Sequence, residues 1–124
     1  MREIKFRVWC KQVEEMHTVE KMGFNEDGLW YVEDKDHDSQ PPYFVGSDDW
    51  TLMQYTGLKD KNGREIYEGD IVKCFVKGDS KVIFKYGCFC LESLRYKNIT
   101  AFCDIFGEME VIGNIYEHSH LLED

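Results

Sequence analysis

Residues 55–72, YTGLKDKNGREIYEGDIV, contain two glycine turns that lie only six residues apart. The first, residues 60–63, is typical of a bulged β-hairpin in which Gly63 takes the left-handed conformation. The second, residues 67–70, suits a type II turn with Gly69 supplying the positive φ at its third position. Two turns this close together bend the chain sharply around a small core. The stretch therefore predicts a corner in a small, strongly bent antiparallel barrel with an SH3-like element.

The rest of the chain carries strand patterns throughout. Residues 4–10, IKFRVWC, alternate apolar and polar side chains with the period of two that a half-buried strand requires. The segments LWYVE, WTLMQYT and CFCLESL are further strand candidates. No segment shows a helical pattern longer than two turns. We therefore predict a mainly β fold, in which additional hairpins accompany the barrel and helix is scarce.

The length of 124 residues suits a single domain that covers residues 1–124. Residues 33–49, EDKDHDSQPPYFVGSDD, form the longest stretch without a strand pattern, and they contain both prolines. Because proline cannot donate to a sheet ladder, we predict an irregular acidic loop here. A linker between two subdomains is the alternative that the sequence leaves open.

Residues 71–86 predict a β-hairpin. With a three-residue loop at residues 78–80, three cross-strand pairs follow: Lys77–Lys81, Phe75–Ile83 and Lys73–Lys85. The opposite face is apolar and is expected in the core: Val72, Cys74, Val76, Val82, Phe84 and Tyr86. The outer face, here called the lysine face, is the candidate binding face: Lys73, Lys77, Lys81, Lys85, Phe75 and Ile83. Its alternative interpretation is a solvated surface on which lysine stems shield the two apolar residues.

The net charge of −9 is unevenly distributed along the chain. Residues 1–50 carry six Lys or Arg against twelve Asp or Glu, residues 51–100 carry nine against six, and residues 101–124 carry none against six. The acidic total disfavours ordinary DNA or RNA binding, for which a basic surface is expected. Like charges that face each other across a sheet are destabilising, so we expect acidic groups to lie against the lysine face. We therefore predict a homo-oligomer in which the acidic ends of the chain meet the lysine face.

The cysteines and histidines give no pattern that predicts a metal, cofactor or catalytic site. The five cysteines include no C-x-x-C pair, and their odd number is typical of free thiols in a reducing cytoplasm. Cys88, Cys90 and Cys103 can be combined with His118 and His120 into a metal site on paper. Buried thiols and surface histidines are the preferred interpretation. We expect no cofactor and no enzymatic activity.

An acidic run in the predicted loop resembles the start of a calcium-binding loop. Asp34, Asp36 and Asp38 have the required spacing. The rest of the pattern fails, because Ser39 stands where glycine is needed and Val45 stands where a bidentate Glu is needed. We therefore interpret the run as part of a solvated acidic loop.

The apolar runs are short, and the N-terminal segment MREIKFRVWCK is charged from its first residues. A membrane span needs about 20 apolar residues, and a signal peptide needs an apolar central region. Neither is present, so the sequence predicts a cytoplasmic protein that does not contact a membrane.

Three stretches carry a resemblance to a known family: MREIKFRVWCKQVEEM (1–16), LMQYTGLKDKNGREIYEGDIV (52–72) and VIGNIYEHSHLL (111–122). Together they resemble the YopX family of phage and prophage proteins. The resemblance implies a small, β-rich protein with a barrel, encoded by a phage or prophage of a bacterial host. It implies no catalytic residues, because members are generally described as being of unknown function. The motif positions are expected to serve turns and core: Tyr55, Gly57, Asp60, Gly63, Ile66, Gly69 and Asp70.

These observations favour an accessory protein that acts by binding, as a homo-oligomer. One alternative is a nucleic-acid-binding SH3-like barrel that uses the lysine face together with Lys59, Lys61 and Arg64, with Tyr86 or Phe75 stacking on bases. A second alternative is an acidic DNA mimic that inhibits a host enzyme by presenting carboxylates in place of phosphates. An enzyme whose site is assembled only in space ranks last.

Overall fold

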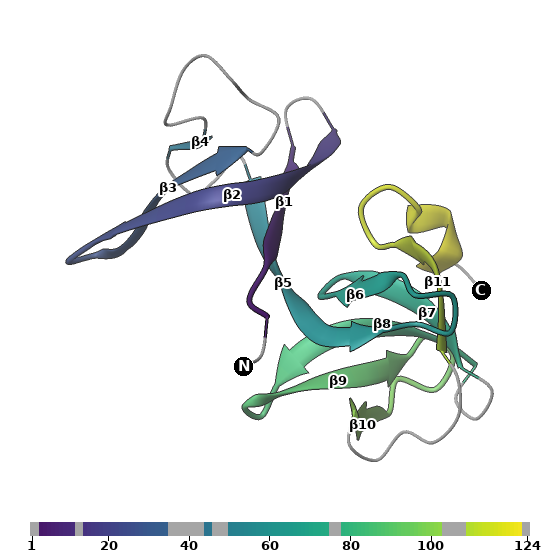
Figure 1. Cartoon of the computed structure of the whole chain (residues 1–124). Coiled ribbons are helices and arrows are strands. Elements are labelled where there is room, and N and C mark those ends of the chain that lie inside the picture. The colour runs from purple at the N-terminus through teal and green to yellow at the C-terminus, as the bar shows by residue number, and fades with distance from the viewer. Residues whose placement is uncertain are drawn as a thin grey trace. The chain divides into compact units, whose positions relative to one another are not determined.

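The computed structural model describes residues 3–11, 14–34, 44–45, 50–74, 78–102 and 109–122. The chain divides into two compact units (Figure 1). The N-terminal unit comprises residues 5–54, and the C-terminal unit comprises residues 1–4 and 55–124. The described elements are strands and one short 3-10 helix, and they form two antiparallel sheets. The prediction of a mainly β protein with little helix is therefore confirmed.

The N-terminal unit holds five strands, in the order β4-β3-β2-β1-β5, of a six-stranded antiparallel sheet whose sixth strand is β6 (Glu65–Tyr67). Its strands are β1 (Phe6–Cys10), β2 (Glu15–Asn25), β3 (Gly28–Asp34), β4 (Phe44–Val45) and the first half of β5 (Trp50–Lys59). The long β2–β3 hairpin turns at residues 25–28. A buried cluster stabilises the unit: Val8, Cys10, Val32 and Trp50.

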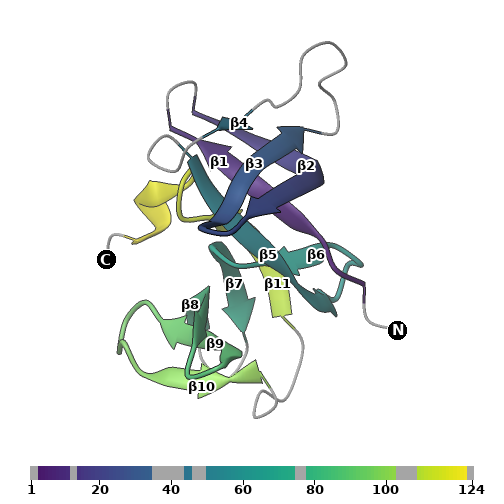
Figure 2. The ribbon, with the colours of Figure 1, turned by 90° about the vertical axis from the view of Figure 1, so that its left-hand side faces the viewer.

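The C-terminal unit holds the second half of β5, which pairs with β6 (Glu65–Tyr67). Its five-stranded antiparallel sheet has the strand order β10-β9-β8-β7-β11 (Figure 2). The bounds are β7 (Asp70–Cys74), β8 (Gly78–Lys85), β9 (Cys88–Ser93), β10 (Ile99–Ala101) and β11 (Met109–Asn114). The 3-10 helix η2 (Ser119–Leu122) follows β11.

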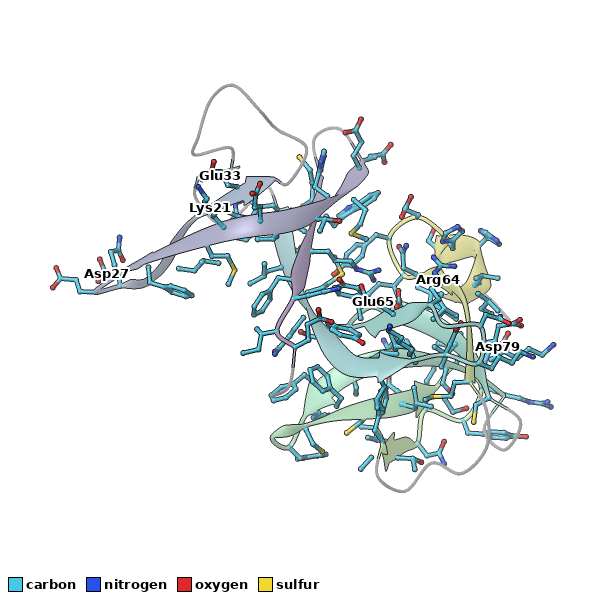
Figure 3. The ribbon with its side chains drawn as sticks, in the orientation of Figure 1. Lys21, Asp27, Glu33, Arg64, Glu65 and Asp79 are labelled. Carbon is cyan, nitrogen blue, oxygen red and sulfur yellow. The ribbon has the colours of Figure 1, made fainter. Side chains whose placement is uncertain are left out.

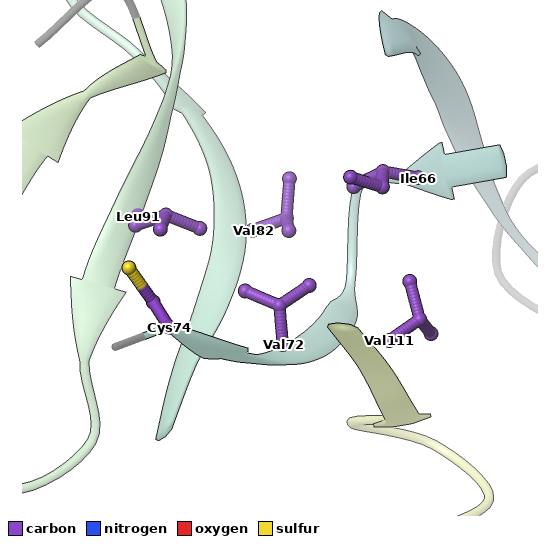
Figure 4. Packing of buried hydrophobic residues seen from close by; sticks show 6 residues of the cluster. All are labelled: Ile66, Val72, Cys74, Val82, Leu91 and Val111. Atoms are coloured by element: carbon purple, nitrogen blue, oxygen red, sulfur yellow. The ribbon is translucent and has the colours of Figure 1, made fainter. Parts of the chain in front are cut away.

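The core of the C-terminal unit gathers buried side chains from five strands (Figure 4). Its members are Ile66, Val72, Cys74, Val82, Leu91 and Val111, with Phe102 and Met109 packed against them. Burying one aliphatic side chain of this size stabilises a fold by about 1.5–3 kcal/mol. Val72, Cys74 and Val82 were predicted as core from the alternation of the hairpin, and their burial confirms that part of the prediction.

Both glycine turns of the opening stretch form as predicted. Gly63 and Gly69 each have φ of +84°, a conformation that L side chains rarely adopt. The N–H of Gly63 donates to the carbonyl of Asp60 at 3.0 Å, which closes the first turn. The N–H of Gly69 donates to the carbonyl of Val82 at 2.9 Å, so the second turn is tied to β8. The turns therefore fix both the local bend and its attachment to the sheet.

The predicted register of the β7–β8 hairpin is wrong. Cys74 pairs with Gly78 and Lys73 pairs with Asp79, so residues 78–80 belong to β8 and do not form the loop. Phe75, Val76 and Lys77 lie outside the described residues. The physical reason is Ser80, which is fully buried and faces Ser93 of β9. A polar residue that occupies an inward position cannot be recognised from apolar alternation alone.

The inward positions predicted for Phe84 and Tyr86 are also wrong. Their exposed fractions are 53% and 81%, which places both outside the core. Tyr86 and Gly87 are the two central residues of the β8–β9 turn, with φ of +56° and +79°. A two-residue type I′ turn requires positive φ at both positions. The strand therefore ends at Lys85, and the alternation that places Val82 inside does not extend to the turn.

The predicted acidic loop is described only in part. Residues 35–43 and 46–49 lie outside the described residues, and the single-domain prediction stays a prediction beside the two compact units. Within the described ranges, no helix is both long and apolar enough to span a bilayer.

Candidate functional site

Acidic side chains of the same sheet lie beside two lysines of the lysine face. Lys73 lies between Asp79 of β8 and Glu110 of β11 in the strand register. The Lys81 ammonium group lies 3.1 Å from a Glu92 carboxylate oxygen on β9. Opposite charges at facing positions stabilise a sheet, so the acid that the lysine face calls for is supplied within this unit. The predicted facing of Lys73 with Lys85 does not occur.

Two further members of the lysine face, Ile83 and Lys85, have no acidic residue as their register partner. Ile83 is partly buried and pairs with Cys90 of β9. Lys85 is exposed at the end of β8, where its register partner is Cys88. Lys77 and Phe75 lie outside the described residues. Of the predicted binding residues that the structure describes, Lys85 is therefore the one that joins an exposed aromatic surface.

That surface is the β8–β9 tip, which we define as residues 84–89. The ammonium group of Lys85 lies 5.3 Å from the centroid of the exposed Tyr86 ring. The Phe84 ring meets the Phe89 ring edge-on at 5.1 Å, which holds Phe84 in place while half of it remains exposed. From Lys81 to Leu91 the chain contains two lysines and no Asp or Glu. The tip therefore presents aromatic rings beside positive charge on a tight turn.

The β2–β3 tip, residues 24–28, has the opposite character. The side chain of Phe24 is 67% exposed. Glu26 and Asp27 follow it, and both are exposed (Asp27 is labelled in Figure 3). The N–H of Asp27 donates to Asn25 Oδ1 at 2.9 Å and fixes the turn. The sequence gave no sign that Phe24, which precedes the turn, would remain exposed.

Asp60 and Asp70 from the opening stretch are buried and bind backbone groups. Asp60 Oδ1 accepts the N–H groups of Asn62 and Arg64 at 2.9 and 2.8 Å. Asp70 Oδ2 accepts the N–H of Tyr67 at 2.8 Å across the second turn. These carboxylates therefore hold the two turns, which agrees with the turn and core duties expected for the motif.

The pKa of Asp60 lies below the ordinary range of an aspartate. Burial alone raises the pKa of this carboxyl, because it penalises the charged form. Hydrogen bonds from the N–H groups of Val111, Arg64 and Asn62, with the charge of Arg64, outweigh burial and lower it. The carboxylate is thus stabilised in its ionised form as a structural element.

The segment after β11 is held by His118. Its Nδ1 accepts the N–H of Asn114 at 3.1 Å. The Asn114 side chain accepts the N–H groups of Tyr116 and Glu117 at 3.0 and 2.8 Å. Gly113 lies against the His118 ring, where an added Cβ would come within 2.8 Å of Cγ and Nδ1. His118 therefore has a structural contact and is more than a surface residue.

The structure brings together only some residues of the metal site considered from the sequence. The Sγ atoms of Cys88 and Cys90 lie 3.6 Å apart, and the rings of His118 and His120 have centroids 6.1 Å apart. Cys103 lies outside the described residues, as do Asp36 and Asp38 of the calcium-like run. Within the described ranges, no group of three or more His, Cys, Asp or Glu side chains could hold a metal ion.

Comparison with protein families gives a match to the YopX protein family over residues 5–123. The chain belongs to the YopX family. Protein EF1440 from Enterococcus faecalis is 28% identical, and the match covers 99% of this chain and all of that protein with a TM-score of 0.67. Protein yopX from Bacillus subtilis is 25% identical, covering 96% of this chain and 98% of that one with a TM-score of 0.70. A comparison with curated proteins gave no match.

Proposed function

We propose that this YopX family protein acts by binding rather than by catalysis, and that it self-associates through its two exposed tips. In this proposal the β8–β9 tip of one copy docks against the β2–β3 tip of another. The observation that carries it is the complementarity of the tips. The β8–β9 tip exposes Phe84 and Tyr86 beside positive charge, and the β2–β3 tip exposes Phe24 beside negative charge.

The aromatic rings supply the affinity in this proposal. Tyr86, Phe84 and Phe24 are among the most exposed large apolar side chains of the described chain. Aromatic side chains bury large areas and are enriched at the centres of protein interfaces. Because the type I′ turn already holds Tyr86 in place, docking it costs little conformational entropy.

The charges supply orientation. Lys85 on one tip would meet Glu26 and Asp27 on the other, whereas two identical tips would repel each other. The contact is therefore heterologous, since each copy contributes a different surface. Such contacts close into rings or continue as open chains of subunits. This proposal replaces the lysine face as the basic partner of the acidic segments, because Lys73 and Lys81 have acid within their own sheet.

The C-terminal unit offers a rigid support for the β8–β9 tip. We propose that this unit closes as the predicted bent SH3-like barrel. Support comes from β5, where Gly57 has φ of +90° and the register with β6 shifts between Tyr55 and Lys59. Further support comes from the backbone bond that ties Gly69 to Val82 of β8.

A charge-swap experiment tests the self-association. Sedimentation velocity would compare the wild type with Lys85→Glu, with Asp27→Lys and with the protein that carries both changes. We expect each single variant to sediment as a smaller species and the double variant to recover the wild-type species. Lys97→Glu is the matched control, because it makes the same change in net charge at an exposed site on the opposite end of β9. If neither single variant changes the sedimentation of an oligomeric wild type, the tips are not the contact.

Single-stranded nucleic acid is a second candidate partner for the β8–β9 tip. Lys85 stacked on an exposed Tyr86 combines the cation and aromatic ring that single-strand binding proteins use. Fluorescence anisotropy with labelled DNA and RNA oligonucleotides at low salt tests this candidate. Binding by a monomeric wild type that Lys85→Glu abolishes would support nucleic acid and overturn self-association.

A further inference from the structure

We propose that Cys88 and Cys90 form a reactive dithiol that takes a small-molecule disulfide as its co-reactant. Cys88 is the attacking thiol, Cys90 is the resolving thiol, and the product is a disulfide between them. The inference does not rest on the proposed self-association, because its observations concern one strand within one chain, although Cys88 belongs to the β8–β9 tip.

The geometry places the two sulfurs in direct contact. Residues i and i+2 of a strand project from the same face, and β9 carries both cysteines at its start. Their Sγ atoms lie 3.6 Å apart. Both sulfurs also lie near the carbonyl oxygen of Lys85, at 3.6 Å for Cys88 and 3.7 Å for Cys90. The thiols thus form one site beside the β8–β9 turn.

The two thiols differ in accessibility. Cys88 is exposed next to Gly87 of the turn, whereas Cys90 is 2% exposed. A reagent in solution therefore reaches Cys88 first, and Cys90 is protected from outside attack but adjacent to whatever Cys88 acquires. Lys85 supplies positive charge beside Cys88, its register partner, which favours an anionic disulfide such as glutathione disulfide.

The reaction balances as two thiol–disulfide exchanges. The Cys88 thiolate attacks one sulfur of the external disulfide, the external S–S bond breaks, and one thiolate leaves to take up a proton. The Cys90 thiolate then attacks the Cys88 sulfur of the mixed disulfide, and the second external thiolate leaves. The two cysteines are oxidised by two electrons, and the external disulfide is reduced to two thiols.

The product would be a strained disulfide. Two residues along an extended strand advance by about 6.6 Å, at the upper end of the Cα separations that disulfides span. Closure therefore requires the start of β9 to shorten, against the pairing of Cys90 with Ile83 and of Cys88 with Lys85. Strained disulfides are readily reduced. We expect the bond to open with a small excess of dithiothreitol.

Peptide-level mass spectrometry tests the proposal on the whole chain carrying Cys103→Ser. After incubation with glutathione disulfide, the peptide with Cys88 and Cys90 should be lighter by two hydrogen atoms. Adding Cys90→Ala should trap a stable glutathione adduct on Cys88. Adding Cys88→Ala should leave Cys90 unmodified. Buried Cys10 and Cys74 serve as internal controls that should stay unmodified in every variant.

The opposite results overturn the proposal. A stable glutathione adduct on Cys88 that never closes, with Cys90 intact, would show that the thiols do not react together. Modification of Cys90 in the Cys88→Ala variant at the rate of Cys88 would show that Cys88 is not the attacking thiol. Circular dichroism of each variant separates these results from unfolding, because an unfolded variant would also expose Cys10 and Cys74.

Discussion

The carboxylate of Asp60 accepts a hydrogen bond from the N–H of Val111, with 2.9 Å between Oδ2 and N. The two residues are 51 positions apart, so a turn in the opening stretch is joined directly to the edge strand β11. A second bond runs in parallel, from the N–H of Lys61 to the carbonyl of Met109 at 3.0 Å. The motif aspartate therefore acts as a clamp between distant parts of the C-terminal unit.

Replacing Asp60 should lower the free energy of unfolding. Asp60→Asn keeps the size of the side chain, but one of the two accepting oxygens becomes an amide nitrogen that faces a backbone donor. We expect the free energy of unfolding to fall by about 3 kcal/mol, the scale for losing a charged bond and leaving a buried donor unpaired. Urea denaturation measures it. Glu20→Gln, which removes a carboxylate at an exposed position, is the control and should change stability by less than about 0.5 kcal/mol.

The same carboxylate predicts a dependence of stability on pH. The pKa of Asp60 is lowered in the folded state, so as pH falls the unfolded chain takes up this proton first. The stabilisation is present above the ordinary aspartate pKa and is lost as pH falls through the folded value. Urea denaturation from about pH 6 to about pH 3 should therefore show wild type and Asp60→Asn converging. Curves that stay parallel throughout would contradict the role given to this carboxylate.

Gly113→Ala tests the contact between β11 and His118. The added Cβ would lie 2.8 Å from the ring, a distance that requires the ring to move and its bond to Asn114 to break. We expect a loss of about 1–3 kcal/mol in the free energy of unfolding. In a His118→Ala background the same glycine substitution should cost much less, since the obstruction is gone. Equal costs in both backgrounds would show that the strain does not come from the histidine.

Tyr86→Asn separates stability from binding at the β8–β9 tip. Asparagine followed by glycine is the preferred pair for a type I′ turn, so the variant should be more stable than wild type by about 0.5 kcal/mol. The same change removes the most exposed aromatic ring of the tip. We therefore expect a higher melting temperature together with weaker self-association. A variant that associates as tightly as wild type would remove Tyr86 from the contact.

The turns were predictable from sequence because their determinants are local. Gly63 and Gly69 need only their own neighbours to specify a positive φ, and both predictions are confirmed. The clamp from Asp60 to Val111 could not be predicted, because it depends on where β11 pairs. Asp60 was assigned to a turn from sequence, and the structure adds the second, distant partner.

The candidate site was predictable to a smaller degree. Lys85 was identified as a binding residue and Tyr86 as an aromatic that could stack, but the predicted alternation, extended past the end of β8, also placed Tyr86 in the core. Tyr86 is exposed because the β8–β9 turn ends the strand at Lys85, and strand alternation alone does not show where a strand ends. The exposed Phe24 was missed for a related reason: a strand pattern does not reveal where a hairpin extends beyond its core.

The molar mass of the wild-type protein, measured by light scattering behind size exclusion in low and high salt, tests the central claim most directly. Binding between oppositely charged tips predicts species larger than one chain in low salt, as closed rings or open chains of subunits, that dissociate in high salt because salt screens exposed charges. The mass of a single chain in both salts at micromolar concentration would contradict self-association. It would show that the two tips do not bind each other.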